Sequence, residues 1–381
     1  MKWNFKAIII FVVVVFLSIL AINHFGQDRN KVVSGNITIW GDEYTYSYIK
    51  EAAEKFEESN KKVNIEVVNV SSKDYFDKLI NTNKKDLPNI VQLNSNDLTK
   101  VIDKHTIQVA NEGSLVNTYK MNFPESRIKE VTIDDQIVAI PATSNPLVLY
   151  LREDVLKEYG YTNSDINTWD DLIKVSKDIY KKSKGKYKGL SAVGKDLNDL
   201  ESLLIMQNME YGTSKDKTED AVKDNIKKLR DENVLTKTSN DGYFGAISSI
   251  NGMKQFMSLD VKCAWTANNA PASKIGGNRF YVSEGENFAV LNSDGSNIKL
   301  INTFLESVTN NTDLALKYAK EGEFFPSYLY TYKSTEIEKE VKNFEGKSPL
   351  VVMSNIYKKA PEIEQYDDYI KIKEDLLKSG I

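Results

Sequence analysis

Apolar and polar positions in the early part of the chain follow a strand–helix order. Residues 36–40 alternate with a period of two and are rich in β-branched side chains, which predicts a strand. Residues 48–60 repeat apolar side chains at helical spacing and predict an amphipathic helix. A second strand at 63–68, a helix at 74–81 and a third strand at 89–93 are expected next. This order predicts a parallel sheet with right-handed crossovers.

A second patterned region begins near the middle of the chain. Residues 147–151 are continuously apolar and predict a buried strand, which the chain enters through a break at 141–146 that contains two prolines. A helix over 152–160 should end at its glycine. Thr168 then predicts an N-cap, with two aspartates in the first turn, for a helix that continues to about Lys182.

The run 139–172 resembles the first hinge crossing of family 1 extracellular solute-binding proteins, the maltose-binding type that serves ABC importers. It reads A-I-P-A-T-S-N-P-L-V-L-Y-L-R-E-D, then a glycine, then T-W-D-D-L, and agrees with the family in pattern and spacing. Three further patches resemble the same family: Pro88–Asp97, Asn251–Trp265 and Glu323–Ser327. The resemblance covers nearly the whole chain after residue 35.

This resemblance implies an α/β fold of the type II periplasmic-binding-protein kind. Each of its two lobes would be a mainly parallel sheet flanked by helices, and a multi-strand hinge would join them. The chain would cross between the lobes near Ala142–Asn145, Ala264–Asn268 and Phe325–Leu329. We therefore expect a division into an N-terminal segment (1–35), lobe 1 (36–143 with 266–325) and lobe 2 (144–265 with 326–381).

The N-terminus carries a membrane signal. Lys2 and Lys6 precede the uncharged apolar run Ala7–Ile22, which is intermediate in length between a signal-peptide core and a spanning helix. The lysines predict that the N-terminus stays cytoplasmic and that the remainder is exported. Because the run is followed by neither a lipobox cysteine nor a small-x-small site, we expect an uncleaved anchor, with a cleaved signal as the alternative. Gln27–Gly35 would be a polar tether.

Composition restricts the classes of function that the chain can have. The 381 residues are 41% hydrophobic and 27% charged, as in a globular protein, and the net charge of −4 gives no basic stripe for nucleic acid. One cysteine, Cys263, and two histidines, His24 and His105, exclude an internal disulfide and disfavour zinc sites and imidazole catalysis. No nucleotide-binding, metalloprotease or nucleophile-elbow motif occurs. We expect no catalytic residue, no metal and no cofactor.

Candidate ligand-binding residues follow strands or match the family's cleft. Trp265 occupies the position of the family's cleft tryptophan and offers a flat face on which a sugar ring can stack; the alternative is a core tryptophan. Asp42, Glu43 and Tyr44 form the loop after the first strand and match the polar loop of the family cleft.

Five other candidates are polar or aromatic. Asn94, Asn96 and Asp97 follow the third strand, where open parallel sheets bind ligands, although an N-cap for the next helix explains them equally well. The resemblance adds two positions to the candidate site, Asn145 at the first hinge and Tyr366 near the C-terminus.

The leading hypothesis is a receptor at the outer face of the cytoplasmic membrane. It would capture a small ligand, a sugar or oligosaccharide, between two lobes and deliver it to the membrane subunits of an ABC permease. One alternative is an anchored sensor that reports ligand to a two-component kinase. A second is a binder of a cationic solute such as an amino sugar or polyamine, and a third is a polysaccharide-acting enzyme, which the residue inventory disfavours.

Overall fold

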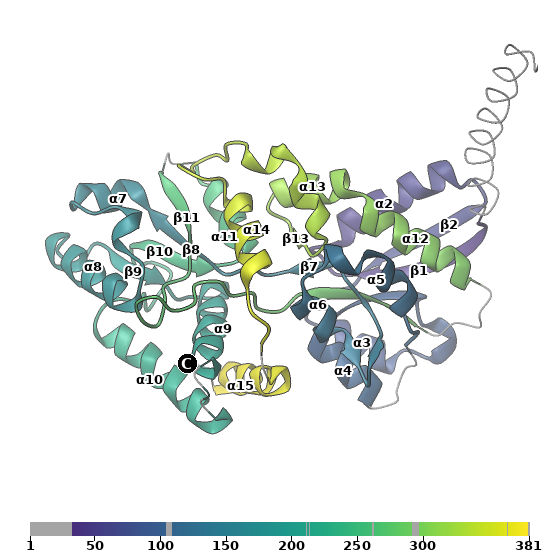
Figure 1. Cartoon of the computed structure of the whole chain (residues 1–381), viewed down its shortest axis with the longest axis horizontal. Coiled ribbons are helices and arrows are strands. Elements are labelled where there is room, and N and C mark those ends of the chain that lie inside the picture. Colours follow the sequence, from purple (N-terminus) through teal and green to yellow (C-terminus); the bar gives the residue numbers. More distant parts are fainter. Residues whose placement is uncertain are drawn as a thin grey trace, which may run out of the picture.

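The computed structural model describes residues 33–103, 109–210, 212, 214–260, 263–291, 297–363 and 365–379. Over these ranges the chain forms two lobes that lie side by side, joined by short strands between them (Figure 1). The expected membrane segment and both histidines lie outside the described residues. In the part that is described, no helix has the length and apolar character needed to cross a membrane.

Lobe 1 is built on a five-stranded sheet in the order β2-β1-β3-β12-β6. Its strands are β1 (Gly35–Gly41), β2 (Val63–Asn69), β3 (Ile90–Asn94), β6 (Ile140–Pro141) and β12 (Glu286–Val290). The helices of this lobe are α2 (Tyr46–Ser59), α3 (Tyr75–Asn81), α4 (Ser95–Asp103), α5 (Gly113–Tyr119), α6 (Glu125–Glu130), α12 (Ile298–Asn310) and α13 (Thr312–Lys320). A small hairpin joins β4 (Thr132–Ile133) to β5 (Gln136–Ile137).

Alternation along β1 explains why helices cover both faces of this sheet. Ile37 and Ile39 belong to the apolar cluster on one face, and Trp40 belongs to the cluster on the other. All three side chains are less than a tenth exposed. Apolar clusters therefore lie on both faces of the strand, as in doubly covered sheets.

Lobe 2 is built on a four-stranded sheet in the order β11-β8-β10-β9. Its strands are β8 (Val148–Arg152), β9 (Lys188–Ser191), β10 (Tyr243–Ser248) and β11 (Trp265–Asn269). The helices that follow these strands are α7 (Glu153–Glu158), α8 (Trp169–Lys182), α9 (Lys195–Met209), α10 (Lys215–Asp231) and α11 (Ile250–Met257). At the start of α8, Thr168 and Asp171 form a reciprocal capping box, so the predicted N-cap is confirmed.

One strand in each sheet runs against the others. β12 pairs antiparallel with β3 and β6, and β8 pairs antiparallel with β10 and β11. Both strands come directly after a crossing between lobes, so they lead away from the hinge, whereas their neighbours end there. The remaining strands of each sheet share one direction. The predicted fold class, two lobes with mainly parallel sheets, is confirmed.

The hinge contains three crossings. β7 (Thr143–Ser144) pairs with β13 (Phe325–Pro326), and this pair carries the first and third crossings. The second crossing lies near 281–286, where the Ser283 N–H donates to the Asn145 carbonyl at 3.0 Å.

The second crossing was expected at Ala264–Asn268, and this position needs correction. Those residues belong largely to β11, which pairs along its length with β8 inside lobe 2. The Thr266 hydroxyl donates to the Leu151 carbonyl at 3.4 Å, and the Asn268 amide to the Leu149 carbonyl at 3.3 Å. The side chains of Thr266 and Asn268 therefore hydrogen-bond to the backbone of β8. The chain leaves lobe 2 only after β11.

The C-terminal part returns to lobe 2. Two 3-10 turns, Leu329–Lys333 and Thr335–Glu338, lead to α14 (Pro349–Lys359), which packs against β11. The last helix, α15 (Tyr366–Ser379), packs against α9 and α10. It lies low in the view between the two lobes, on the side of lobe 2 that is turned toward α4 (Figure 1).

Candidate binding cleft between the lobes

The edge of the lobe 1 sheet that faces lobe 2 gathers several acidic side chains. Asp42 follows β1, and Glu286 begins β12 opposite Asn94 at the end of β3. Burial, followed by the neighbouring carboxylates of Asp42, Asp97 and Glu284, raises the pKa of Glu286 to about 8. Three of the residues expected from sequence, Asp42, Asn94 and Asp97, are therefore brought together here.

The facing edge of lobe 2 is also acidic. α9 begins just after β9 and carries Asp196 and Asp199 in its first turns. The Asp199 carboxylate accepts hydrogen bonds from the Ser249 N–H at 3.0 Å and from the Ser248 hydroxyl at 3.2 Å. Burial raises the pKa of Asp199 to about 6 despite these bonds. These two aspartates had no sequence signal beyond their place after a strand.

Polar contacts connect the lobes across this region. The Lys195 ammonium donates to the Tyr44 hydroxyl at 2.7 Å, so one predicted site residue contacts α9 directly. On α15, Glu374 accepts from the Asn96 amide at 2.8 Å and from Lys100 at 2.6 Å. These bonds join segments that belong to different lobes, so they favour the arrangement in which the lobes face one another closely.

Several predicted residues also serve the local backbone. The Asp42 carboxylate accepts from the Tyr44 and Thr45 N–H groups, both at 3.0 Å, at the start of α2. Asn94 accepts from the Asp97 N–H at 2.8 Å, which is the helix-capping role considered for this group. Their position at the cleft is consistent with the binding hypothesis, but part of their hydrogen-bonding capacity is already used.

Two further predicted residues lie at the margins of the cleft. Glu43 accepts from the Ser72 N–H at 2.9 Å and from its hydroxyl at 2.7 Å, and thereby joins two exposed loops. Asn145 lies at the hinge, where its carbonyl accepts from Ser283. Neither contact points to a ligand.

Trp265 does not face the cleft. Its side chain is 2% exposed, and its ring stacks on Phe256 at 3.7 Å between centroids with an interplanar angle of 10°. It pairs with Arg152, at the end of β8 farthest from the hinge, and the Arg152 guanidinium lies 5.8 Å from the centre of its ring. The structure therefore supports the alternative of a core tryptophan, because no face of the ring is left for a sugar.

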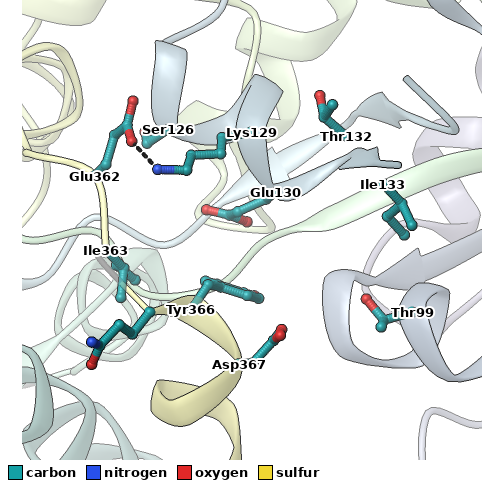
Figure 2. Close-up of a pocket in the computed structure, with 11 residues that line it drawn as sticks. Thr99, Ser126, Lys129, Glu130, Thr132, Ile133, Glu362, Ile363, Tyr366 and Asp367 are labelled. Carbon is teal, nitrogen blue, oxygen red and sulfur yellow. Dashed lines mark hydrogen bonds and ion pairs between the residues drawn. The ribbon is translucent and has the colours of Figure 1, made fainter. Parts of the chain in front are cut away.

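A cavity of about 340 Å³ lies between α15 and lobe 1. We name it the cleft cavity; Figure 2 shows it, with the Lys129–Glu362 ion pair at one end, Thr99 and Ile133 at the other, and Glu130 and Tyr366 between them. Pockets for small ligands in proteins begin at about 300 Å³. Its lining comprises Thr99, Ser126, Lys129, Glu130, Thr132, Ile133, Glu362, Ile363, Gln365, Tyr366 and Asp367.

Among the predicted residues, Tyr366 is the one that lines this cavity. Its hydroxyl is shielded from solvent and has no hydrogen-bond partner. The Ser95 hydroxyl is close enough to lower the Tyr366 pKa, but it donates its hydrogen bond to Glu130 at 3.2 Å. Burial, followed by the charges of Glu130 and Glu284, raises the Tyr366 pKa well above its usual value, so the phenol is a neutral hydrogen-bond donor.

Sequence reasoning missed Glu130 and its partner Arg127. The Arg127 side chain is completely buried and pairs with Glu130, and it also donates to the Asn287 side chain at 2.7 Å. Burial nevertheless raises the pKa of Glu130 to about 6. The only available signal was their i, i+3 spacing in a short charged helix, which is typical of a solvated surface pair.

Replacement of Glu286 by glutamine should make stability less dependent on pH. The Glu286 pKa is about 8 in the folded chain and about 4.5 in the unfolded chain. Between these values the unfolded chain binds fewer protons, so the free energy of unfolding falls as pH rises. We expect Glu286→Gln to recover about 3 kcal/mol at pH 8 relative to pH 5. Urea denaturation at both pH values measures this difference, with the exposed Glu66→Gln as control.

An equal response of the Glu286 and Glu66 variants to pH would show that Glu286 is not held protonated by its neighbours. The charged or titratable groups around Glu286 come from several elements and are those of Asp42, Tyr75, Asp97 and Glu284.

The described residues contain no group of three or more His, Cys, Asp or Glu side chains that could hold a metal ion. The cleft cavity, at about 340 Å³, is large enough for a small organic solute. Hydroxyls, amides, carboxylates and an aromatic ring line the facing surfaces. This combination suits hydrogen bonding to a polar small molecule.

Comparisons with known proteins agree with this geometry. The structure resembles the sugar-binding protein MalE of Xanthomonas citri, with a TM-score of 0.69 and 13% identity over 91% of this chain and 93% of that chain. It resembles the cyclic alpha-maltosyl-1,6-maltose binding protein of Arthrobacter globiformis with a TM-score of 0.68 and 16% identity, over 91% and 95% of the two chains. Both similarities concern the fold.

Two sequence matches complete the comparison. A curated lactose-binding protein of Rhizobium radiobacter is 25% identical over 182 residues, so the match spans 45% of this chain and 41% of that relative's length. Residues 51–336 match the family described as bacterial extracellular solute-binding protein, whose relatives here are binding proteins and not enzymes. Because this match covers most of the 381 residues, the chain belongs to the bacterial extracellular solute-binding proteins.

Proposed function

We propose that the protein is a carbohydrate receptor that binds a sugar or oligosaccharide between its lobes and delivers it to an ABC import permease. The observation that supports this most is the cleft cavity, which lies between parts of the chain that pack on different lobes. The family match adds support for an extracytoplasmic solute-binding role. The structural relatives named as sugar-binding and maltose-binding proteins favour a carbohydrate among possible solutes.

The hinge supports a mechanism of lobe closure. The β7–β13 pair and the neighbouring 281–286 segment are short, while the two lobes have separate apolar cores. Short connections can absorb a rotation without disturbing packed cores. A ligand that contacts both lobes stabilises the closed arrangement by its differential affinity for that state. The permease would then recognise the closed, loaded receptor.

A thermal-shift screen followed by small-angle scattering tests this proposal. A bound sugar should raise the melting temperature by mass action and shrink the particle without altering its circular dichroism. Lactose, maltose, maltotriose and larger maltodextrins are suitable first probes. If a sugar binds at saturation and the scattering profile does not change, the closure mechanism is wrong, although the binding role stands. If no sugar, amino sugar or glycan binds, the carbohydrate assignment is wrong.

Replacement of Tyr366 by alanine should weaken sugar binding by about 1–2 kcal/mol, because the ring supplies a flat apolar face to the cavity. Calorimetric titration measures the change. Tyr330→Ala is a suitable control, since that tyrosine is 49% exposed and does not line the cleft cavity. Equal affinities for the two variants would show that the ligand does not contact Tyr366.

We further propose that the receptor is held at the outer face of the cytoplasmic membrane by Ala7–Ile22. The support is the sequence pattern described above, since this segment lies outside the described residues. Full-length protein from its native host should sediment with membranes and keep its N-terminal peptide in mass spectrometry. Soluble protein that begins between Ala21 and Ser34 would support signal cleavage instead.

A further inference from the structure

A second cavity, with a volume of about 630 Å³, lies within lobe 2. We name it the lobe 2 groove; its lining comes from β11, α14, the loop between α7 and α8, and the segments around them, and includes Asn167, Ala267, Asn269, Arg279, Lys347 and Lys359. It shares no lining residue with the cleft cavity. In Figure 1, β11 and α14 lie in the upper part of lobe 2, whereas α15, which borders the cleft cavity, lies low in the view. The lobe 2 groove is therefore separate from the cleft.

The lobe 2 groove has an excess of positive charge. Three basic side chains line it, those of Arg279, Lys347 and Lys359, against the single carboxylate of Glu345. Glu345 already has a basic neighbour outside the groove, Lys157 at 3.6 Å. Among the residues that the structure describes, none of the three basic side chains forms an ion pair. This excess occurs in a chain whose net charge is −4.

Neutral oxygens hold Arg279 in place. Its guanidinium donates to the Ala270 carbonyl at 2.8 Å, to the Asn167 side chain at 2.7 Å and to the Asn269 carbonyl at 3.2 Å. Burial lowers the pKa of Arg279, and the charge of Asp171 acts in the opposite direction. A guanidinium has five N–H donors, so two remain for a further partner. A fixed, half-buried cation without a carboxylate partner is stabilised by an anion.

The backbone of β11, the edge strand of its sheet, gives an independent observation. At Trp265 the outward backbone groups pair with the segment 343–345, and at Asn269 the outward carbonyl accepts from Arg279. Backbone groups alternate along a strand, so the N–H and carbonyl of Ala267 face the same outward side. No second segment of the described chain pairs with Ala267 there, although this residue is only 9% exposed. Buried backbone groups are nearly always paired, so this part of the edge indicates a polar occupant.

We propose that the lobe 2 groove is a second binding site, which takes a small organic anion that carries a carboxylate or a phosphate group. The anionic group pairs with the Arg279 guanidinium, whose planar donors suit both carboxylate and phosphate. The ammonium groups of Lys347 and Lys359 add attraction. Hydroxyl groups of the same molecule bond to the outward N–H and carbonyl of Ala267. This inference goes beyond the proposed function, because the site belongs to one lobe and does not depend on a solute in the cleft.

The same observations disfavour other occupants. A neutral sugar leaves the charge of Arg279 uncompensated, and a metal cation is repelled by the basic side chains. An extended peptide that adds a strand to a sheet needs a longer free edge than one residue. At β11 only Ala267 is open, since the outward groups on either side of it, at Trp265 and Asn269, already have partners.

The direct test compares matched ligands by isothermal titration calorimetry on the full-length protein. The probes are digalacturonate with its neutral counterpart galactobiose, and glucose 6-phosphate with glucose. We expect the anion of at least one pair to bind at least about tenfold more tightly than its neutral counterpart at pH 7 and low salt. The difference should shrink as salt rises. Preference for digalacturonate identifies a carboxylate ligand, and preference for glucose 6-phosphate identifies a phosphate ligand.

A pair of lysine variants locates the anion. Lys359→Gln removes a charge that lines the lobe 2 groove, and Lys358→Gln removes the neighbouring charge on α14, which does not line it. We expect the first variant to weaken anion binding by about twofold to fivefold and the second to leave it unchanged. Arg279→Gln should weaken anion binding by about tenfold. Because Arg279 also ties β11 to the loop before α8, its melting temperature is measured alongside, and the lysine pair decides the matter if Arg279→Gln does not fold.

The contrary outcomes are distinct from a failure of the proposed function. If neither anion binds, or if each neutral sugar binds as tightly as its anion, the inference is wrong. Equal losses in the two lysine variants, or no loss in either, would also contradict it, because the anion would then bind elsewhere. None of these results affects the carbohydrate role, which the maltodextrin screen decides at the cleft. A maltodextrin bound there should keep its affinity in both lysine variants.

Discussion

Trp265→Ala should lower the free energy of unfolding by about 3–5 kcal/mol, because it removes a large side chain that is only 2% exposed and leaves a cavity against Phe256. Ligand affinity should stay within about twofold of the original value, since the residue lies at the end of β8 and β11 farthest from the hinge. Urea denaturation and calorimetric titration on the same variant measure both quantities.

A second variant separates the core interpretation of Trp265 from the ligand-stacking interpretation. Trp265→Phe keeps an aromatic ring that can stack on Phe256 and should recover more than half of the lost stability. The contrary result would be a variant with near-normal stability and strongly reduced affinity. That result would restore the ligand-stacking interpretation, which the sequence favoured from the position of the tryptophan alone.

Arg127→Met should also cost about 3–5 kcal/mol of stability, since it leaves the buried Glu130 carboxylate without its partner. Arg127 does more than pair with Glu130. It donates to the Thr143 carbonyl at 3.1 Å and to the Glu286 carbonyl at 3.2 Å, so it ties α6 to both the first and the second crossing of the hinge. Chemical denaturation at pH 7 measures the loss.

The matched control is the double variant Arg127→Met with Glu130→Met. Replacing both members of a buried ion pair by apolar side chains is commonly far less costly than removing one of them. We therefore expect the double variant to be more stable than Arg127→Met alone. If the double variant is less stable than either single variant, the hinge contacts of Arg127, and not its charge, account for its effect.

These two residues show different limits of sequence reasoning. Trp265 lies between an apolar run and a polar Thr-Ala-Asn-Asn segment, which is typical of the edge of a core that faces a cleft. The structure explains the polar segment otherwise, because Thr266 and Asn268 bond to the backbone of β8. Arg127 and Glu130 have the spacing of an exposed helix pair, and only packing against the hinge buries them.

The expected binding residues show the same contrast between local sequence pattern and tertiary packing. Asp42, Asn94 and Asp97 were placed at the cleft because they follow strands whose carboxyl ends meet at one edge of a sheet, and the structure brings them together there. Glu286 joins them from β12, a strand that enters from the opposite direction after a hinge crossing. That crossing was expected elsewhere, so Glu286 could not be assigned to the cleft from the sequence.

The sequence by itself determined the elements and the fold class, because these depend on local periodicity and on end signals such as Thr168 and Asp171. It also determined the kind of protein, through a hinge run whose prolines and buried strand are close in the chain. Only the tertiary structure decided which side chains face the cleft. Burial, partner distances and the pKa values of Glu130 and Glu286 arise from segments more than a hundred residues apart, which no local pattern encodes.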